Sequence, residues 1–393
     1  MPLSNWIQKH ALPTTAAGFD AILAELPQVE LLALGEALHG AEAILILRNR
    51  LFQHLVEQHQ FRALALECSF PQARCVNDYI VGRGDRAQFE DWLGHGMGIL
   101  EANRELIEWM RAYNETHPDA LHFYGFDMPL GKASFASPRF VLDVVENPAR
   151  KQRIADLIGP DGDWENMAVI QDPSKGVGTT PRANELRVEI ENLIAELRNA
   201  QPGRTAAQHD AALCRQLLAA HAMMASGASY SQTLGIRDAM MADNLEFILN
   251  RERSRGRVFA FAHNSHLKRS QAQWSMGAIT HSWWPAGARL SATLGPRYAI
   301  IGTGIGESAE NGIAPPAPGS LESLFTGDAL LSLSAAPKAE FDALPTRSGS
   351  ALNPTYFPWS RDTARDFDHL AFVATSPYHR GGLPLQAWDG AQS

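Results

Sequence analysis

The chain has 393 residues, of which 45% are hydrophobic and 20% are charged, as in an ordinary globular protein and unlike a disordered, coiled-coil or collagen-like chain. Lysine and arginine number 34 and aspartate and glutamate 43, so the formal net charge is −9. Such an acidic chain is a poor candidate for binding nucleic acid or an anionic membrane, because both need clustered positive charge. The length predicts two lobes, or one large domain with an insertion.

Cysteine usage and the N-terminal sequence favour a cytoplasmic protein. Three cysteines, Cys68, Cys75 and Cys214, are too few and too scattered for a disulfide framework or a four-thiolate zinc site. The N-terminus lacks the apolar core of a signal peptide, and no run of about 18 apolar residues predicts a membrane-spanning helix. We therefore expect a reducing, cytoplasmic environment.

Six short apolar runs predict buried strands. Each lacks polar alternation, which is typical of strands in a sheet that is covered on both faces. The runs are Val29–Gly35, Arg62–Leu66, Leu121–Phe126, Arg257–Ala262, Tyr298–Gly302 and His369–Ala374. They predict an α/β fold with a mostly parallel central sheet flanked by helices.

The segment between the first two strands predicts an amphipathic helix over Glu42–His59, because its apolar residues recur at helical spacing. Strand, helix and strand in about 35 residues form a βαβ unit, so we expect the first two strands to be a parallel pair. A second helix is predicted over Glu101–Glu115, before the third strand.

A mainly helical insertion is predicted in the middle of the chain. No strand pattern occurs from about residue 133 to 226, whereas Asn184–Asn199 and Ala206–Ala225 have helical periodicity and are separated by Gln201-Pro202-Gly203. Strand patterns resume after Arg257. We therefore predict an α/β core made of residues 1–132 and 227–393, interrupted by a helical insertion at 133–226.

Ionisable residues follow four of the predicted strands at their carboxyl ends, the edge where open α/β sheets bind ligands. In chain order they are Glu36 and His39, then Glu67, then Asp127, and finally His263 and His266. Two glutamates, an aspartate and up to three histidines at one edge predict an acid–base site.

Structural interpretations of single residues stay open at this point. Glu36 and His39 can cap the following helix, and Glu67 can be an ordinary charge at a strand end. Cys68 can be a nucleophile, although a packed small residue is the simpler interpretation. The coincidence at four strand ends favours a site.

Two further patterns point away from other activities. Gly302–Gly306 (GTGIG) lacks the third glycine and the following helix of a dinucleotide-binding loop, so we predict a turn there. The absence of a G-x-S-x-G motif argues against a serine hydrolase of the α/β-hydrolase type.

The same residues, with their neighbours, resemble the motifs of the erythromycin esterase family. Gly35–Gly40 (GEALHG) is similar to the opening GE-x-x-H signature of that family, and Arg48 is similar to an arginine on its next helix. The other similar segments are Arg62–Glu67 (RALALE), Tyr124–Pro129 (YGFDMP), Arg237–Asn244 (RDAMMADN) and Ala262–His266 (AHNSH). The motifs are collinear from about residue 33 to 266, whereas the insertion and the C-terminal segment match none.

The resemblance implies a hydrolase that opens the lactone ester of 14-membered macrolide antibiotics and thereby confers resistance. It implies water as the nucleophile, no metal or other cofactor, and a small-molecule macrolide as the partner; it leaves the oligomeric state undetermined.

The chemistry of the residues agrees with this implication. Ester hydrolysis needs a base for the water, a donor for the oxyanion and an acid for the leaving alkoxide. We predict that His39 is the general base, oriented by Glu36 and Glu67, and that His263 polarises the carbonyl or shares the water. The two histidines are interchangeable in these roles at this level.

The remaining candidates have supporting roles. His266 supports His263, and Arg48 orients a glutamate or offsets its charge; Asp127 and Arg237 complete the set. A surplus of carboxylate in the cleft would suit the dimethylamino sugar of a macrolide.

Two other functions remain as alternatives. Glu36, His39, Glu67 and His263 are acceptable zinc ligands, so a metal-dependent hydrolase of another lactone or ester is one, with a divalent metal as its cofactor. A biosynthetic-accessory binding protein of the same fold is the other, because a fold can keep its pocket while its chemistry changes.

Overall fold

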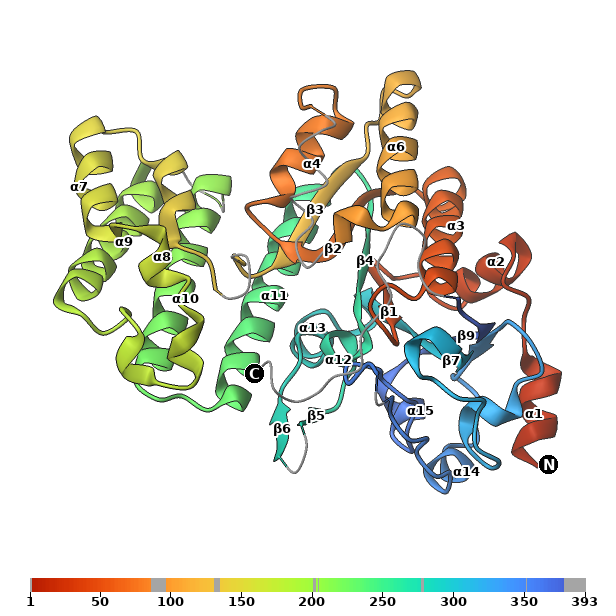
Figure 1. The fold of residues 1–393 in the computed structure, drawn as a ribbon. Coiled ribbons are helices and arrows are strands. Elements are labelled where there is room, and N and C mark those ends of the chain that lie inside the picture. Colours follow the sequence, from red (N-terminus) through yellow and green to blue (C-terminus); the bar gives the residue numbers. More distant parts are fainter. Residues whose placement is uncertain are drawn as a thin grey trace.

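The computed structural model describes residues 2–85, 97–130, 135–200, 203, 205–276, 279–350 and 352–377. Its centre is a seven-stranded sheet with the strand order β3-β2-β4-β1-β7-β9-β8, in which all neighbours are parallel except β8 and β9 (Figure 1). Its strands are β1 (Leu31–Glu36), β2 (Phe61–Ser69), β3 (His122–Asp127), β4 (Arg257–His263), β7 (Tyr298–Glu307), β8 (Ala329–Ser332) and β9 (His369–Thr375). The predicted α/β class and mostly parallel sheet are confirmed.

Helices cover both faces of the sheet. Successive side chains of each strand point to opposite faces, so each strand contributes to two apolar cores. Leu32 and Leu34 of β1 belong to a core shared with α2, α3, α4 and α6. Leu31 and Ala33 belong to a second core, on the other face, shared with α1, α11 and α13. The longer helices are α1 (Leu3–His10), α2 (Ala16–Ala24), α3 (Glu42–His59), α4 (Ala73–Ile80), α6 (Glu101–Thr116), α7 (Pro148–Ile158), α9 (Pro181–Ala200), α10 (Ala206–Ala225), α11 (Tyr230–Glu252) and α13 (Ala286–Leu294). The short ones are α8 (Asp161–Trp164), α12 (Asn264–Leu267), α14 (Lys338–Asp342) and α15 (Thr363–Asp366).

The first two strands are parallel but are not neighbours, which corrects the expected pair. β4 lies between them: Phe259 pairs with Leu32 of β1 on one side and with Leu64 of β2 on the other. A βαβ pattern indicates the direction of the second strand, but the crossover can skip a position that a later strand fills. The candidate residues of β1 and β2 therefore lie on either side of the carboxyl end of β4.

The segment Gly302–Gly306 is part of strand β7, so the predicted turn is wrong. Its glycines are required by close packing. A Cβ added at Gly304 would lie 2.7 Å from ring atoms of Trp359, and one at Gly302 would lie 2.7 Å from the ring of Phe367. Glycine here lets aromatic rings pack against the strand backbone.

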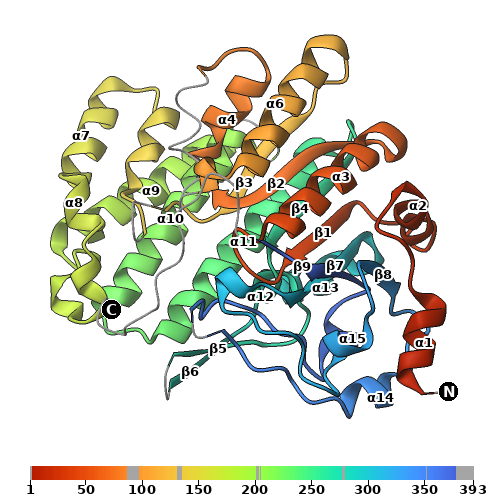
Figure 2. The ribbon, with the colours of Figure 1, turned by 45° about the vertical axis from the view of Figure 1, so that its right-hand side comes forward.

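Three further strands were not predicted. The edge strand β8 has only four residues, and β5 (Ala272–Met276) and β6 (Ile279–Trp283) form a separate two-stranded ribbon. The ribbon is partly polar and lies apart from the central sheet, below it in Figure 2. A short or partly polar strand lacks the continuous apolar run that identified the buried ones.

The helices α7, α8, α9 and α10 lie together beside the sheet, on the side of β3 (Figures 1 and 2). They share a separate apolar core that includes Ile154, Trp164, Ile190 and Leu218. α9 and α10 match the two helices predicted for this segment. The predicted boundary at 132–133 lies outside the described residues, and of the break at 201–203 only Gly203 is described.

Among the helices of the described ranges, none is long and apolar enough to cross a membrane.

Candidate active site

The strand ends bring the candidate residues to one edge of the sheet. β1 ends at Glu36 and β4 at His263, and these two residues pair in register. Glu67 lies in β2 on the other side of β4, and Asp127 is the last residue of β3. The side chains of four separate segments thus meet at the predicted edge, and the contacts below join them.

The connection between β1 and α3 holds a carboxylate–imidazole pair. Nδ1 of His39 donates to Oε1 of Glu36 over 2.5 Å. Glu36 is buried, whereas 39% of the His39 side chain is exposed. Glycine precedes and follows the pair for steric reasons. A Cβ at Gly35 would lie 2.0 Å from the Asn264 side-chain oxygen, and Gly40 has a φ of 75°.

The contact with Glu36 determines which ring nitrogen of His39 carries the hydrogen and raises the pKa of the ring. Because Nδ1 carries the hydrogen that Glu36 accepts, the neutral ring keeps a lone pair on Nε2. Loss of hydration lowers the pKa of His39, but the charge of Glu36, its hydrogen bond and the charge of Glu67 together raise that pKa above its ordinary value. His39 is therefore a base of increased strength with an exposed ring.

His263 is held as a neutral imidazole. Its Nε2–H donates to the carbonyl oxygen of Thr355 over 2.9 Å, and Nδ1 accepts from Oγ of Ser265 over 2.7 Å. Burial, followed by the nearby charge of His39, lowers the pKa of His263 to about 3. Its ring centroid is 5.1 Å from that of His39, so the two predicted histidines are brought together. The Thr355 bond must break before His263 can polarise a substrate carbonyl.

His266, in contrast, is held as an imidazolium. Nδ1 lies 2.9 Å from an oxygen of Asp238, and Nε2 lies 3.2 Å from Oε1 of Glu67. Burial lowers the pKa of His266, but these two carboxylates raise it to about 10. Asp238 is fully buried and also accepts from the indole of Trp283 and the backbone N–H of Ala286.

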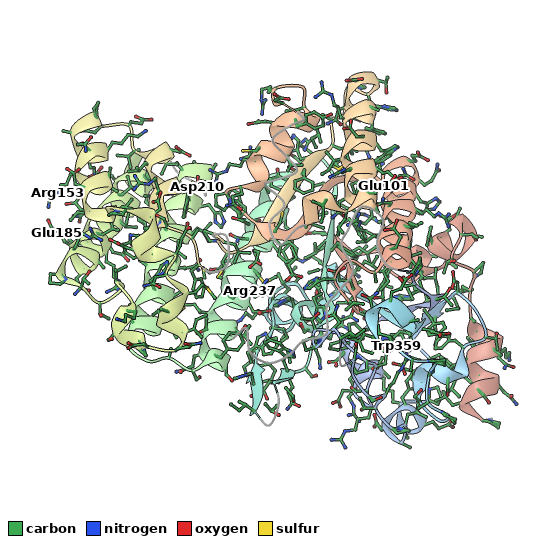
Figure 3. The ribbon with its side chains drawn as sticks, in the orientation of Figure 1. Glu101, Arg153, Glu185, Asp210, Arg237 and Trp359 are labelled. Carbon is green, nitrogen blue, oxygen red and sulfur yellow. The ribbon has the colours of Figure 1, made fainter. Side chains whose placement is uncertain are left out.

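Arg237, on α11, links the remaining carboxylates. Its Nε lies 3.0 Å from Oδ1 of Asp127, and Nη2 lies 2.6 Å from Oδ2 of Asp127 and 2.8 Å from Oε1 of Glu67. Glu67 also accepts the backbone N–H of His263 over 2.7 Å. Burial raises the pKa of Glu67, but the charges of His266, His39 and Arg237 lower it far more. Arg237 lies between the helices α7–α10 and the sheet (Figure 3).

Arg48 and Cys68 lie behind the site and do not face the cleft. Arg48 is fully buried on α3, where Nη1 donates to the side-chain oxygen of Asn103 over 2.7 Å and the guanidinium lies 4.8 Å from the centre of the Phe261 ring. Burial lowers its pKa to about 10 despite the opposing charge of Glu36, so Arg48 stays a cation that offsets that carboxylate. Cys68 is buried, and burial raises its pKa well above the ordinary value, which supports the packing role.

Two cavities meet at this site. One of about 870 Å³ is lined by His39, His263, His266, Arg237, Lys268, Trp274 and the loop around Thr355, among others. A second, of about 400 Å³, lies between α11 and the segment around Met167 and is lined mainly by apolar side chains, Met128, Phe135 and Met224 included. Tyr230, Leu234 and Arg237 line both. A ligand much larger than a simple ester therefore has room beside His39.

The site also contains residues that the strand-end argument missed. Asp238 sits next to Arg237 in the segment that resembled a family motif, so only its role was undetected. Tyr230 and Thr355 had no signal, because they come from a helix start and a C-terminal loop that reach the cleft only through the tertiary fold.

Comparisons with known proteins decide the family. The family model described as erythromycin esterase matches residues 56–375, which is most of the chain. The chain belongs to the erythromycin esterase family. The family model begins after Glu36, His39 and Arg48, so these three residues lie outside the matched range.

Named members of the family are distant relatives. The chain is 22% identical to erythromycin esterase type II of Escherichia coli over 69% of this chain and 67% of that protein. It is 23% identical to the type I enzyme of Escherichia coli, with 73% of each protein covered.

Solved structures share the fold. A Bacillus cereus protein has a TM-score of 0.73 at 18% identity over 97% of this chain and 98% of its own. A succinoglycan biosynthesis protein has a TM-score of 0.72 at 17% identity, with the same coverage. A histidine-to-asparagine mutant of the erythromycin esterase EreC, in its open conformation, has a TM-score of 0.67 at 16% identity over 93% of this chain and 95% of its own.

Proposed function

We propose that this member of the erythromycin esterase family hydrolyses the lactone ester of macrolides, with His39 as the general base that activates water. The observation that carries the proposal is the 2.5 Å contact between Glu36 and His39, whose ring is 39% exposed in a cavity of about 870 Å³. The names of the distant relatives support the same substrate class.

The reaction needs one proton carrier. Nε2 of His39 takes a proton from water as the water oxygen attacks the acyl carbon, and Glu36 stabilises the imidazolium that forms. The acyl–oxygen bond of the tetrahedral intermediate then breaks, and His39 returns the proton to the leaving alkoxide. The product is a linear hydroxy acid, and the histidine is neutral again.

Arg237 and His266 are the two cations of the acid–base group that contact Glu67. Both line the same cavity as His39. The hydrogen bonds of Arg237 use Nε and Nη2, and with the described residues Nη1 makes none. We assign Nη1 as an oxyanion donor, with His266 as a fixed positive charge behind it. His263 packs beside the base and is the second donor if its bond to Thr355 opens.

The two joined cavities support a large, mostly apolar substrate. The apolar cavity of about 400 Å³ would hold part of the macrolide ring, while the ester lies at His39. The expected surplus of carboxylate for an amino sugar is not available, because Glu36 and Glu67 are buried and paired with His39, Arg237 and His266.

The deciding experiment is incubation of the protein with macrolides of different ring size, followed by mass spectrometry. We expect product heavier by one water, and a loss of at least about 100-fold in turnover for His39→Ala, since general-base catalysis contributes roughly 10²–10⁴-fold. His281→Ala is the control, because His281 lies on the β5–β6 ribbon outside the acid–base group. Intact drug with the wild-type protein would overturn the macrolide proposal, and a fully active His39→Ala would overturn the mechanism.

A metal-dependent hydrolase remains the second candidate for one specific reason. A nitrogen of His39 and one oxygen each of Glu36 and Glu67 lie within 4.8 Å of one another, which suits a divalent cation. Turnover that is lost on chelation and restored by added zinc would favour this candidate over metal-free general-base catalysis.

A further inference from the structure

A second group of metal-ligand side chains lies far from the cleft, where α2 packs beside α3 (Figures 1 and 2). It consists of Asp20 on α2 and of His54 and His59 on α3. Helix α3 begins at Glu42, close to His39 in the sequence. His54 lies twelve residues further along this helix, which places it about 18 Å from Glu42 along the helix axis. No step of the proposed hydrolysis uses these three residues.

The three side chains converge on one point. Oδ1 of Asp20 lies 2.7 Å from Nε2 of His54 and 2.8 Å from Nε2 of His59. All three candidate ligand atoms lie within 4.8 Å of one another. Both imidazoles therefore direct the same ring nitrogen at a single carboxylate oxygen.

The surroundings hold this arrangement and leave one side open. Phe19 packs against His54 with 5.8 Å between ring centroids, and the His54 and His59 side chains are 13% and 23% exposed. Asp20 is 54% exposed, so solvent reaches the group from the carboxylate side. His59 is the last residue of α3, and the negative end of the helix dipole favours a cation there.

Two imidazoles, one carboxylate and one open position are a typical ligand set for Zn²⁺. Zinc–ligand bonds of about 2.0–2.1 Å in a tetrahedron place ligand atoms about 3.4 Å apart. The observed separations of 2.7 and 2.8 Å must therefore widen by about 0.6–0.7 Å, which rotation of the half-exposed Asp20 side chain can supply.

We propose that Asp20, His54 and His59 form a surface Zn²⁺ site, with water as the fourth ligand, that links α2 to α3. The metal joins two helices that pack on the same face of the sheet, so its binding stabilises the folded chain. The site is separate from any metal that the cleft binds.

Calorimetric titration of the full-length, metal-free protein with zinc chloride tests this proposal. The titration uses a His39→Ala background, so that Glu36, His39 and Glu67 do not contribute a second site. We expect one zinc per chain, bound at least about tenfold more weakly after His54→Gln/His59→Gln, since even loss of outer-shell partners costs 10–100-fold. His117→Gln, at the exposed end of α6, is the matched control and should bind zinc normally.

Thermal unfolding gives an independent readout. In the same His39→Ala background, zinc should raise the Tm of the parent protein and of His117→Gln, but not of the double variant or of Asp20→Asn. Asp20→Asn changes one half-exposed group and guards against misfolding of the double variant. Equal zinc binding by the double variant, or no binding by the parent protein, would overturn the proposal. Ester hydrolysis by the double variant with His39 intact should stay unchanged, so this outcome is independent of the proposed activity.

Discussion

The ionisation of His39 depends on Glu36, and this dependence gives a pH prediction. The carboxylate helps to raise the pKa of His39, and the base is inactive below that pKa because it is protonated. We expect kcat/KM of the wild-type protein to fall as the pH drops through a value above 6.5, the ordinary pKa of histidine. In Glu36→Gln this acid limb should move to lower pH, and the plateau rate should fall because the ring loses its charged partner.

The pH profile of kcat/KM for both proteins measures this effect. Glu30→Gln, a partly exposed glutamate just before β1, is the control for a change of net charge. An acid limb that stays in place in Glu36→Gln would show that Glu36 does not tune the base.

We expect Asp238 to be a positioning residue that acts through His266. Its carboxylate is one of the two groups that raise the pKa of His266 to about 10. We expect Asp238→Asn to lower that pKa, to move the alkaline limb of the pH profile to lower pH, and to reduce kcat about tenfold through loss of charge at the oxyanion. An amide oxygen can still accept from Trp283, so the backbone fold should remain.

The matched control is Asp243→Asn, which changes a carboxylate on the same helix that accepts from Gln216. A loss of activity in Asp238→Asn with an unshifted alkaline limb would contradict a role through His266.

The sequence predicted which residues meet at one edge of the sheet better than it predicted their protonation states. Glu36, Glu67, Asp127 and His263 were predictable because parallel strands end at one edge whatever their order. Hydrogen-bond partners were not predictable, because they depend on side chains of distant elements, such as Thr355 against His263. The same limit applied to charge: His263 and His266 follow the same strand, yet one is neutral and the other is an imidazolium.

At the scale of elements, apolar runs predicted the buried strands, and periodicity predicted α3, α9 and α10 to within a few residues. The failures have a common cause. The neighbour of β1 and the strand at Gly302–Gly306 are both decided by packing between segments that are remote in sequence. The local sequence pattern does not indicate which strand lies between β1 and β2, or which aromatic ring packs against a glycine of β7.

The packing of β7 gives a stability prediction. The methyl group added by Gly304→Ala would lie 2.7 Å from ring atoms of the buried Trp359. We expect a loss of about 1–3 kcal/mol in the free energy of unfolding, the usual cost of overpacking a core. Urea denaturation measures it.

Gly327→Ala is the control, because a Cβ there meets nothing within 4 Å. Equal stability of the two variants would show that Trp359 moves aside at no cost.

At the scale of the whole molecule, the second cavity joins the helices beside the sheet to the strand-end site. Ala228, in the turn between α10 and α11, lines this apolar cavity. We expect Ala228→Trp to fill it and to raise KM for macrolides by about tenfold or more, while hydrolysis of a small ester such as p-nitrophenyl acetate stays unchanged.

Ser226→Trp tests the same turn without filling the cavity, since Ser226 does not line it. Steady-state kinetics on both substrates provide the comparison. An unchanged KM for macrolides in Ala228→Trp would exclude the apolar cavity from substrate binding.

The place of β4 in the sheet has a consequence for biosynthesis. Among the described strands, β1 pairs only with β4 and β7, and both are encoded more than 200 residues downstream. While the ribosome is still translating the first 256 residues, the strand that leads to Glu36 and His39 has no hydrogen-bonding partner, whereas β2 and β3 can already pair. The Glu36–His39 pair is thus translated early, but the sheet edge that positions it forms only after the final third of the chain has emerged.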